Sequence, residues 1–179
     1  MKISVVVANR AVIDPTINPE NFSQIGDTWA GWQQWHQCHQ KNVICHDTNT
    51  AKRMIDLGFH RACKFWIPES VFAIANRPDT VGFYAGDFVH EVQDQEEIVA
   101  LHIASSSSDI VVMIGFDWEP LHTVDPILLH QRANRDGLIA QVVNDTPTTQ
   151  WVITDDVPDC LKERPNVMQE NVKNLLQDA

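Results

Sequence analysis

Apolar runs of strand length alternate with amphipathic helical segments along this 179-residue chain. The clearest run is Ile110–Asp117, in which seven apolar residues precede a carboxylate. A strand that is apolar at every position must be buried on both faces, which is typical of a central strand in a parallel sheet. Gly115 and Asp117 then lie at its carboxyl end, where open α/β sheets usually bind ligands. We therefore expect a binding site at that edge.

Further apolar runs and capping residues predict the other elements. Strands are expected at Ile3–Ala8, Asn42–His46, Ala62–Ile67 and Gln150–Thr154. Helices are expected from Asp27 or Thr28 to about Gln40, from Asn49 or Thr50 to Leu57, from Glu91 to about Ser106, from Pro126 to about Val143, and from Val167 to Leu176. Residues 11–26 carry loop signals, and residues 74–90 form an excursion or a hairpin.

Strands that alternate with helices predict crossover connections and a parallel sheet. We expect one α/β domain over residues 1–179, a Rossmann-like three-layer sandwich whose mostly parallel sheet has about five strands in the order 3-2-1-4-5. This order puts the topological switch point between the first and fourth strands. The prediction depends on Ser4–Ala8 and Val111–Gly115 being parallel neighbours.

Charge and cysteine content limit which partners and which cellular compartment we expect for this chain. The net charge of −11 disfavours binding to nucleic acid or to an anionic membrane. The apolar start, Met1–Val7, is too short for a signal peptide or a membrane span. Four cysteines without a CxxC pair indicate reduced thiols, as in the cytoplasm. We expect a cytoplasmic protein that binds a small molecule, with a homo-oligomer as a possible assembly.

Polar residues at or just past the predicted strand ends are the candidates for the site. Asn9 can both donate and accept hydrogen bonds, which suits a base or a ribose. Arg10 can bind a phosphate or a carboxylate through two hydrogen bonds. The alternative is that these side chains cap strands and helices, as Asp47 would do before the second helix. The full set is Asn9, Arg10, His46, Asp47, Gly115, Asp117, Asp155 and Asp156.

Three other chemistries are less well supported. Histidines and cysteines crowd residues 36–46, but without paired CxxC or HxxxH spacing, so we predict no metal site there. A magnesium site from Asp47, Asp117 and Asp155 would fit a phosphoryl hydrolase. No GxSxG motif marks a nucleophile, and no glycine follows the first strand where a dinucleotide loop needs one.

Aromatic and histidine residues on predicted helices are interpreted as core. Trp29, Trp32 and Trp35 recur at helical spacing and form a stripe that is more often buried than used as a sugar or base platform or as a subunit contact. His102 falls on the inward face of its helix and is expected to be a hydrogen-bonded core histidine.

Residues 100–117, Ala-Leu-His-Ile-Ala-Ser-Ser-Ser-Ser-Asp-Ile-Val-Val-Met-Ile-Gly-Phe-Asp, resemble the helix–strand unit of sialyltransferase-like proteins and of the related archaeal hydroxymethylpterin pyrophosphokinases. The first strand, ending in Asn9, is also similar to theirs. The resemblance covers about a third of the chain. It implies that Asn9 contacts a nucleotide and that Asp117 lies near the donor site. Arg10 and its two successors replace the Gly-Pro-Ser of the family's nucleotide loop.

The leading hypothesis is a nucleotide or nucleotide-sugar binding domain with glycosyltransferase-like activity. Asn9, Arg10, Gly115 and Asp47 would contact the ligand, and His122 with Asp117 would carry catalysis, with His130 a second candidate for the family's histidine. The alternatives are a non-catalytic interaction protein on a Rossmann-like scaffold and a metal-dependent phosphoryl hydrolase. The sequence identifies no cofactor, and it leaves open whether the chain is an enzyme.

Overall fold

The computed structural model describes residues 1–8, 13–33, 40–69, 81–84, 95–119 and 121–177. Its centre is one eight-stranded sheet in the order β5-β4-β3-β2-β1-β6-β7-β8, in which all strand pairs are parallel. The strands are β1 (Ile3–Val7), β2 (Asp27–Gly31), β3 (Asn42–Ile44), β4 (Lys64–Pro68), β5 (Val81–Tyr84), β6 (Ile110–Ile114), β7 (Gln150–Ile153) and β8 (Val167–Gln169). The predicted α/β class and parallel sheet are confirmed.

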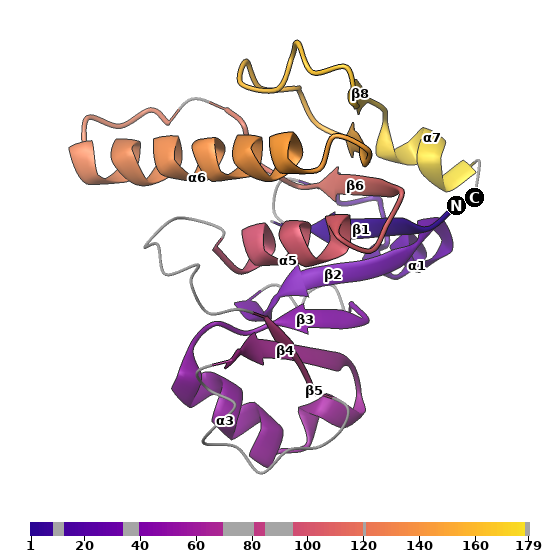
Figure 1. The fold of residues 1–179 in the computed structure, drawn as a ribbon, viewed down its shortest axis with the longest axis vertical. Coiled ribbons are helices and arrows are strands. Elements are labelled where there is room, and N and C mark those ends of the chain that lie inside the picture. The colour runs from indigo at the N-terminus through magenta and orange to yellow at the C-terminus, as the bar shows by residue number, and fades with distance from the viewer. Residues whose placement is uncertain (9–12, 34–39, 70–80, 85–94, 120, 178–179) are drawn as a thin grey trace.

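Helices cover both faces of this sheet (Figure 1). The long helices α5 (Gln95–Ser105) and α6 (Pro126–Asp145) pack on one face. The opposite face is covered by α1 (Phe22–Ile25) and α7 (Val172–Gln177) over the central strands, and by α3 (Thr48–Asp56) over β3 and β4. Short 3-10 turns at Pro19–Asn21 and Phe59–Arg61 complete the described elements.

The strands β1 and β6 lie side by side, as predicted. Their register pairs Ser4 with Val111 and Val7 with Ile114. Val111–Ile114 of β6 are all buried, with alternate side chains in the cores above and below the sheet. Burying each such side chain contributes about 1.5–3 kcal/mol, which explains why the most apolar strand is central.

The strand count and order differ from the prediction because of β2. This strand occupies Asp27–Gly31, where a helix was predicted, and it lies between β1 and β3. Tryptophans at helical spacing favoured the helix, but Trp29 is buried in the strand and packs 5.4 Å from the ring of Trp66. The remainder of that predicted helix includes residues 34–39, and with them Trp35, which lie outside the described residues. The run from Thr28 to Gly31 is fully buried, and tertiary packing overrides the helical spacing.

Two edge strands were also missed. The strand β5 lies within the predicted excursion, and its pairing with β4 extends one edge of the sheet. At the other edge, residues predicted to be one helix from Val167 to Leu176 divide into β8 and α7. Asn171 separates the two, and its side chain accepts a hydrogen bond from the N–H of Lys173 (2.8 Å).

The helix α5 differs from its prediction in the position of His102. His102 is exposed and does not face the core. The helix buries Ile98, Leu101 and Ala104, and burial of the neighbouring Val99 and Ala100 as well widens its apolar side. His102 is therefore not a core histidine.

Candidate functional site

The switch point of the sheet lies between β1 and β6, because the chain moves outward from β1 toward β5 and then returns to β6. The two strands stay paired to their ends, where the N–H of Ala8 donates to the carbonyl oxygen of Ile114 (2.9 Å). The carboxyl end of the strands at a switch point is the position at which open α/β sheets bind ligands. Asn9 and Arg10 follow β1 directly, and both lie outside the described residues.

A pocket of about 200 Å³ opens beside this switch point. Its lining combines apolar side chains of the core under β1 and β6 with carboxylates, an amide, a hydroxyl and an ammonium group. The lining residues are Ile13, Asp14, Ile17, Ile114, Gly115, Thr154, Asp155, Asn171, Val172 and Lys173. The pocket thus joins the exits of β6 and β7 to the connection after β1 and to α7.

Gly115 shapes the floor of the pocket. Its φ of 73° lies in the left-handed region, which a side chain makes costly. The turn brings the N–H groups of Gly115 and Phe116 to the carboxylate of Asp155, where they favour its charged form. The predicted glycine at the end of β6 is therefore placed at the pocket, although through its backbone conformation.

Asp155 is the most unusual residue of the pocket. It follows Thr154, whose hydroxyl donates to the carbonyl oxygen of Met113 (3.0 Å) and fixes the exit of β7 against β6. Its Oδ2 atom is buried and has no hydrogen-bond partner among the described residues. Burial raises the pKa of Asp155 to about 6, with the charges of Asp156 and Asp117 adding to the shift. This carboxyl group can exchange a proton near neutral pH.

Two of the lining residues, Asp14 and Lys173, form an ion pair. Nζ of Lys173, on α7, lies 2.6 Å from Oδ2 of Asp14. The N–H and hydroxyl of Thr16 donate to Oδ1 of Asp14 at 2.8 and 2.6 Å. These contacts, with that of Lys173 the strongest, hold the pKa of Asp14 well below its usual range. Asp14 and Lys173 thus form an electrically neutral wall.

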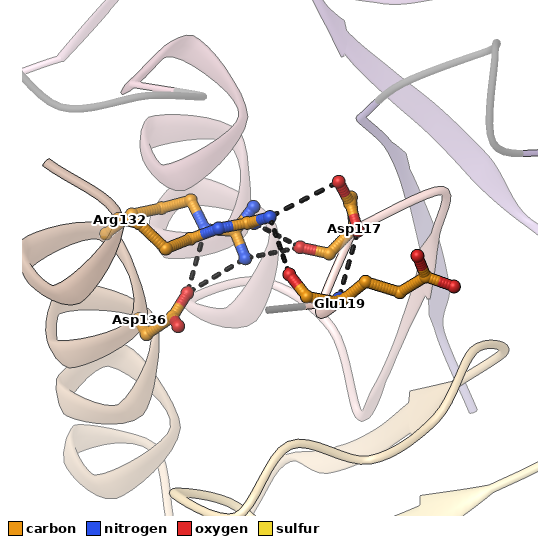
Figure 2. Close-up of polar contacts among 5 residues, drawn as sticks. Asp117, Glu119, Arg132 and Asp136 are labelled. Carbon is orange, nitrogen blue, oxygen red and sulfur yellow. Dashed lines mark hydrogen bonds and ion pairs between the residues drawn. The ribbon is translucent and has the colours of Figure 1, made fainter. Parts of the chain in front are cut away.

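Asp117 belongs to a different cluster, on the α6 side of the sheet (Figure 2). Arg132 donates to the backbone carbonyl of Asp117, to its carboxylate (3.2 Å) and to the carbonyl of Glu119 (3.2 Å). Arg135 is fully buried, and it donates to the carbonyl of Asp117 (2.6 Å) and forms an ion pair with Asp136 (2.8 Å). The two arginines therefore anchor the loop that carries Gly115.

His46 and Asp47 lie at the end of β3, away from the pocket. Asp47 caps α3 by accepting the N–H of Thr50 (2.6 Å), which is the capping role considered as the alternative. The ring of His46 contacts the hydroxyl of Tyr84 (3.1 Å) and the amide of Gln95 (3.3 Å). These are contacts within the network that joins β3, β5 and α5.

The structure separates Asp47 from the other two carboxylates proposed for magnesium. Asp47 follows β3 and Asp155 follows β7, with β2, β1 and β6 between them. Neighbouring strands are about 4.8 Å apart, so these strand ends are about 19 Å apart. Within the described ranges, no group of three or more histidine, cysteine or acidic side chains could hold a metal ion. The members of the histidine–cysteine cluster at residues 36–39 lie outside those ranges.

The remaining predicted residues lie on the connection to α6 and on that helix. His122 and His130 are exposed, and His130 contacts the amide of Asn134 (3.1 Å). Asp156 is also exposed, next to Asp155. Sequence reasoning did not single out Asp14, Thr154 or Lys173, because their joint position depends on tertiary contacts between the two ends of the chain.

Comparison with protein-family models, with curated proteins and with solved structures finds no match to this chain.

None of the helices in the described part of the chain has the length and apolar character needed to cross a membrane. Cys45 and Cys63 are free buried thiols, and Cys160 is a free exposed one.

Proposed function

We propose that this chain binds a nucleotide or a nucleotide sugar at the carboxyl edge of β1, β6 and β7. The observation that supports the proposal is the pocket at the switch point, beside the left-handed turn of Gly115 and the unpaired oxygen of Asp155. In the sequence, Asn9 and Arg10 directly follow β1, and the guanidinium of Arg10 suits a phosphate group.

A glycosyltransferase-like reaction is the activity that we propose for this site. A base removes the proton of an acceptor hydroxyl, the acceptor oxygen bonds to the anomeric carbon, and the nucleotide leaves with the electrons of the broken bond. Two described residues are candidates for the base. They are His122, which is exposed on the connection to α6, and Asp117, whose carboxylate is paired with Arg132.

The test is the shift of the thermal midpoint on adding cytidine and uridine nucleotides. A ligand at 100 times its dissociation constant stabilises the folded chain by about 2.7 kcal/mol. The matched variants are Val172→Trp, which fills the pocket, and Val124→Trp, which adds the same indole at a site that is 97% exposed. We expect the shift in the wild type and in Val124→Trp but not in Val172→Trp, each measured against its own midpoint. No shift with any nucleotide at concentrations above millimolar would refute the proposal.

Release of free nucleotide from a cytidine or uridine nucleotide sugar, with and without a hydroxyl acceptor, tests the activity. Turnover that is lost in His122→Asn and kept in Asp117→Asn supports His122 as the base. The opposite pattern gives that role to Asp117.

Self-association is a second candidate, favoured by the exposed end of α6. Val124, Ile127, Leu128 and Leu129 are 97%, 66%, 47% and 43% exposed at the start of this helix. The helix extends beyond the end of α5 at this point (Figure 1). Asp125 is the one acidic residue in the sequence from Val124 to Arg135, so little of the net charge of −11 lies on this segment. We propose a second copy of this chain as the partner of that surface.

A further inference from the structure

Asp155, one of the residues that line the pocket, carries a hydrogen-bond acceptor without a donor. Oδ2 of Asp155 is buried and has no hydrogen-bond partner among the described residues. The N–H groups of Gly115 and Phe116 contact the same carboxylate but do not satisfy this atom. A buried acceptor without a partner is costly, because the oxygen has lost the water that it would otherwise bind. A ligand that donates a hydrogen bond to it would remove that cost.

The charges along the pocket wall disfavour an anion in this position. Asp14 and Lys173 form an ion pair at 2.6 Å, so their charges offset each other. The charge of Asp155 is the one that remains among the described lining residues. A phosphate placed beside it would meet a like charge in a partly desolvated site, whereas a neutral hydroxyl would not.

The size and the apolar wall narrow the ligand further. The pocket of about 200 Å³ is smaller than the roughly 300–1,000 Å³ of sites for drug-sized ligands, so it holds one ring and not a whole nucleotide. Ile13, Ile17, Ile114 and Val172 offer an apolar surface to the C–H groups of such a ring. Thr154 and Asn171 add further polar groups at the opening.

We propose that this pocket takes a neutral hydroxyl-bearing ring, a pentose or a hexose, which donates a hydrogen bond to Oδ2 of Asp155. The inference rests on the proposed function, since it assigns the sugar part of the nucleotide or nucleotide sugar to this pocket and leaves the phosphates outside it. Asp155 is then the residue that selects for a hydroxyl group.

The proposal carries a pH dependence. Burial raises the pKa of Asp155 to about 6, and Asp156 and Asp117 strengthen the effect. The other charged groups that line the pocket are Asp14 and Lys173, which are paired. The ionised carboxylate is the stronger acceptor, so binding weakens as the pH falls through about 6.

The experiment is a titration of the ¹⁵N-labelled full chain with ribose, uridine, uridine diphosphate and inorganic phosphate, at pH 7.5 and pH 5. Asp155→Asn removes the acceptor charge, and Asp156→Asn removes an adjacent, exposed charge as the matched control. We expect ribose and uridine to shift the amides of Gly115 and Thr154. Asp155→Asn should weaken this binding about 10-fold to 100-fold, and Asp156→Asn should leave it unchanged. At pH 5 the wild type should bind about tenfold more weakly, and Asp155→Asn should not change with pH.

The outcomes separate this inference from the proposed function. Uridine diphosphate that binds equally to the wild type and Asp155→Asn overturns the sugar assignment and leaves nucleotide binding intact. Ribose or uridine binding that needs Asp155, without any response to the diphosphate, supports the sugar pocket and overturns the nucleotide proposal. Inorganic phosphate that shifts Gly115 and Thr154 overturns the assignment of a neutral ring, and no response to any of the four probes overturns both proposals.

Discussion

Arg135, in the middle of α6, donates a hydrogen bond to the backbone carbonyl of Asp117 at 2.6 Å. The guanidinium is fully buried, and its ring contact with Trp118 (4.9 Å) fixes its plane. The helix α6 therefore holds the loop after β6 in place. Since the same loop supplies the N–H groups of Gly115 and Phe116 to Asp155, this anchor also sets the floor of the pocket.

Replacing this arginine tests the anchor. We expect Arg135→Met to lower the free energy of unfolding by about 2–3 kcal/mol, because the carbonyl of Asp117 and the carboxylate of Asp136 lose a buried charged donor. Urea unfolding at pH 7 measures the difference. The control is Arg164→Met, at an exposed position, where a change within about 0.5 kcal/mol is expected. Equal unfolding midpoints for the two variants would contradict the anchoring role.

Asp155 should make the stability depend on pH. Its folded pKa of about 6 lies above the ordinary value of 3.8, so its contribution to stability is full below 3.8 and is lost as the pH rises through 6. At pH 7.5 the ionised group destabilises the fold. Asp155→Asn should therefore be more stable than the wild type at pH 7.5 by about 1 kcal/mol, after allowance for solvent access.

The comparison is made by urea unfolding at pH 7.5, 6 and 4. The gap between Asp155→Asn and the wild type should narrow toward pH 4, where both side chains are neutral. Asp156→Asn removes the same charge from the exposed neighbour and serves as the control for the net charge of −11. A gap that stays constant across this range, or one that Asp156→Asn reproduces, would show that the pKa of Asp155 is not raised.

The sequence predicted the centre of the sheet better than its edges. Both faces of β6 are buried, so an unbroken apolar run such as Ile110–Ile114 can be identified without knowledge of its neighbours. The strand β2 has the same burial over Thr28–Gly31, but its residues do not form an unbroken apolar run, and tryptophans spaced three apart imitate a helix face. At the edges, β5 and β8 are defined by their pairing and not by their composition.

The residues of the candidate site could also be predicted only in part. Gly115 and Asp155 could be predicted because each follows a strand whose position in the sheet could be inferred. Asp47 and Asp117 satisfied the same rule, yet the structure assigns the first to a helix cap and the second to an ion pair. Position at a strand end therefore selects candidates, and the partner of each carboxylate decides between them. That partner is a tertiary contact, which periodicity does not encode.

Glu96 should stabilise the exits of β2 and β3, on the side of the carboxyl edge away from the pocket. It lies in the first turn of α5 and accepts the N–H of His46 (2.9 Å), with further backbone contacts from Trp32 and Gln33. Burial raises its pKa, and these donors oppose the shift. We expect Glu96→Ala to lower the free energy of unfolding by about 2–4 kcal/mol, because it leaves backbone donors of the β2 and β3 exits unpaired.

Urea unfolding again gives the measurement, and Glu119→Ala is the control because the side chain of Glu119 is exposed. Ribose binding adds a second readout. Since Glu96 lies beside β2 and β3 and the pocket lies beside β6 and β7, folded Glu96→Ala should keep its affinity for the sugar. If folded Glu96→Ala lost its affinity for ribose in the absence of denaturant, the β2–β3 side of the edge would be coupled to the pocket beside β6 and β7.

The exposed end of α6 predicts that the chain self-associates. A helix end with Ile127, Leu128 and Leu129 exposed on successive positions presents apolar side chains around most of its circumference, since successive residues are about 100° apart. Pairing with the same surface of a second copy would bury them in an isologous contact.

Sedimentation velocity over a range of concentrations should show a dimer, and the double variant Ile127→Ser with Leu128→Ser should raise the dissociation constant of that dimer by about tenfold or more. Leu57→Ser changes a leucine that is 62% exposed at the end of α3 and should leave the dimer intact. A chain that sediments as a monomer at every concentration, or a dimer that Leu57→Ser weakens as much as the double variant does, would remove the basis for this interface.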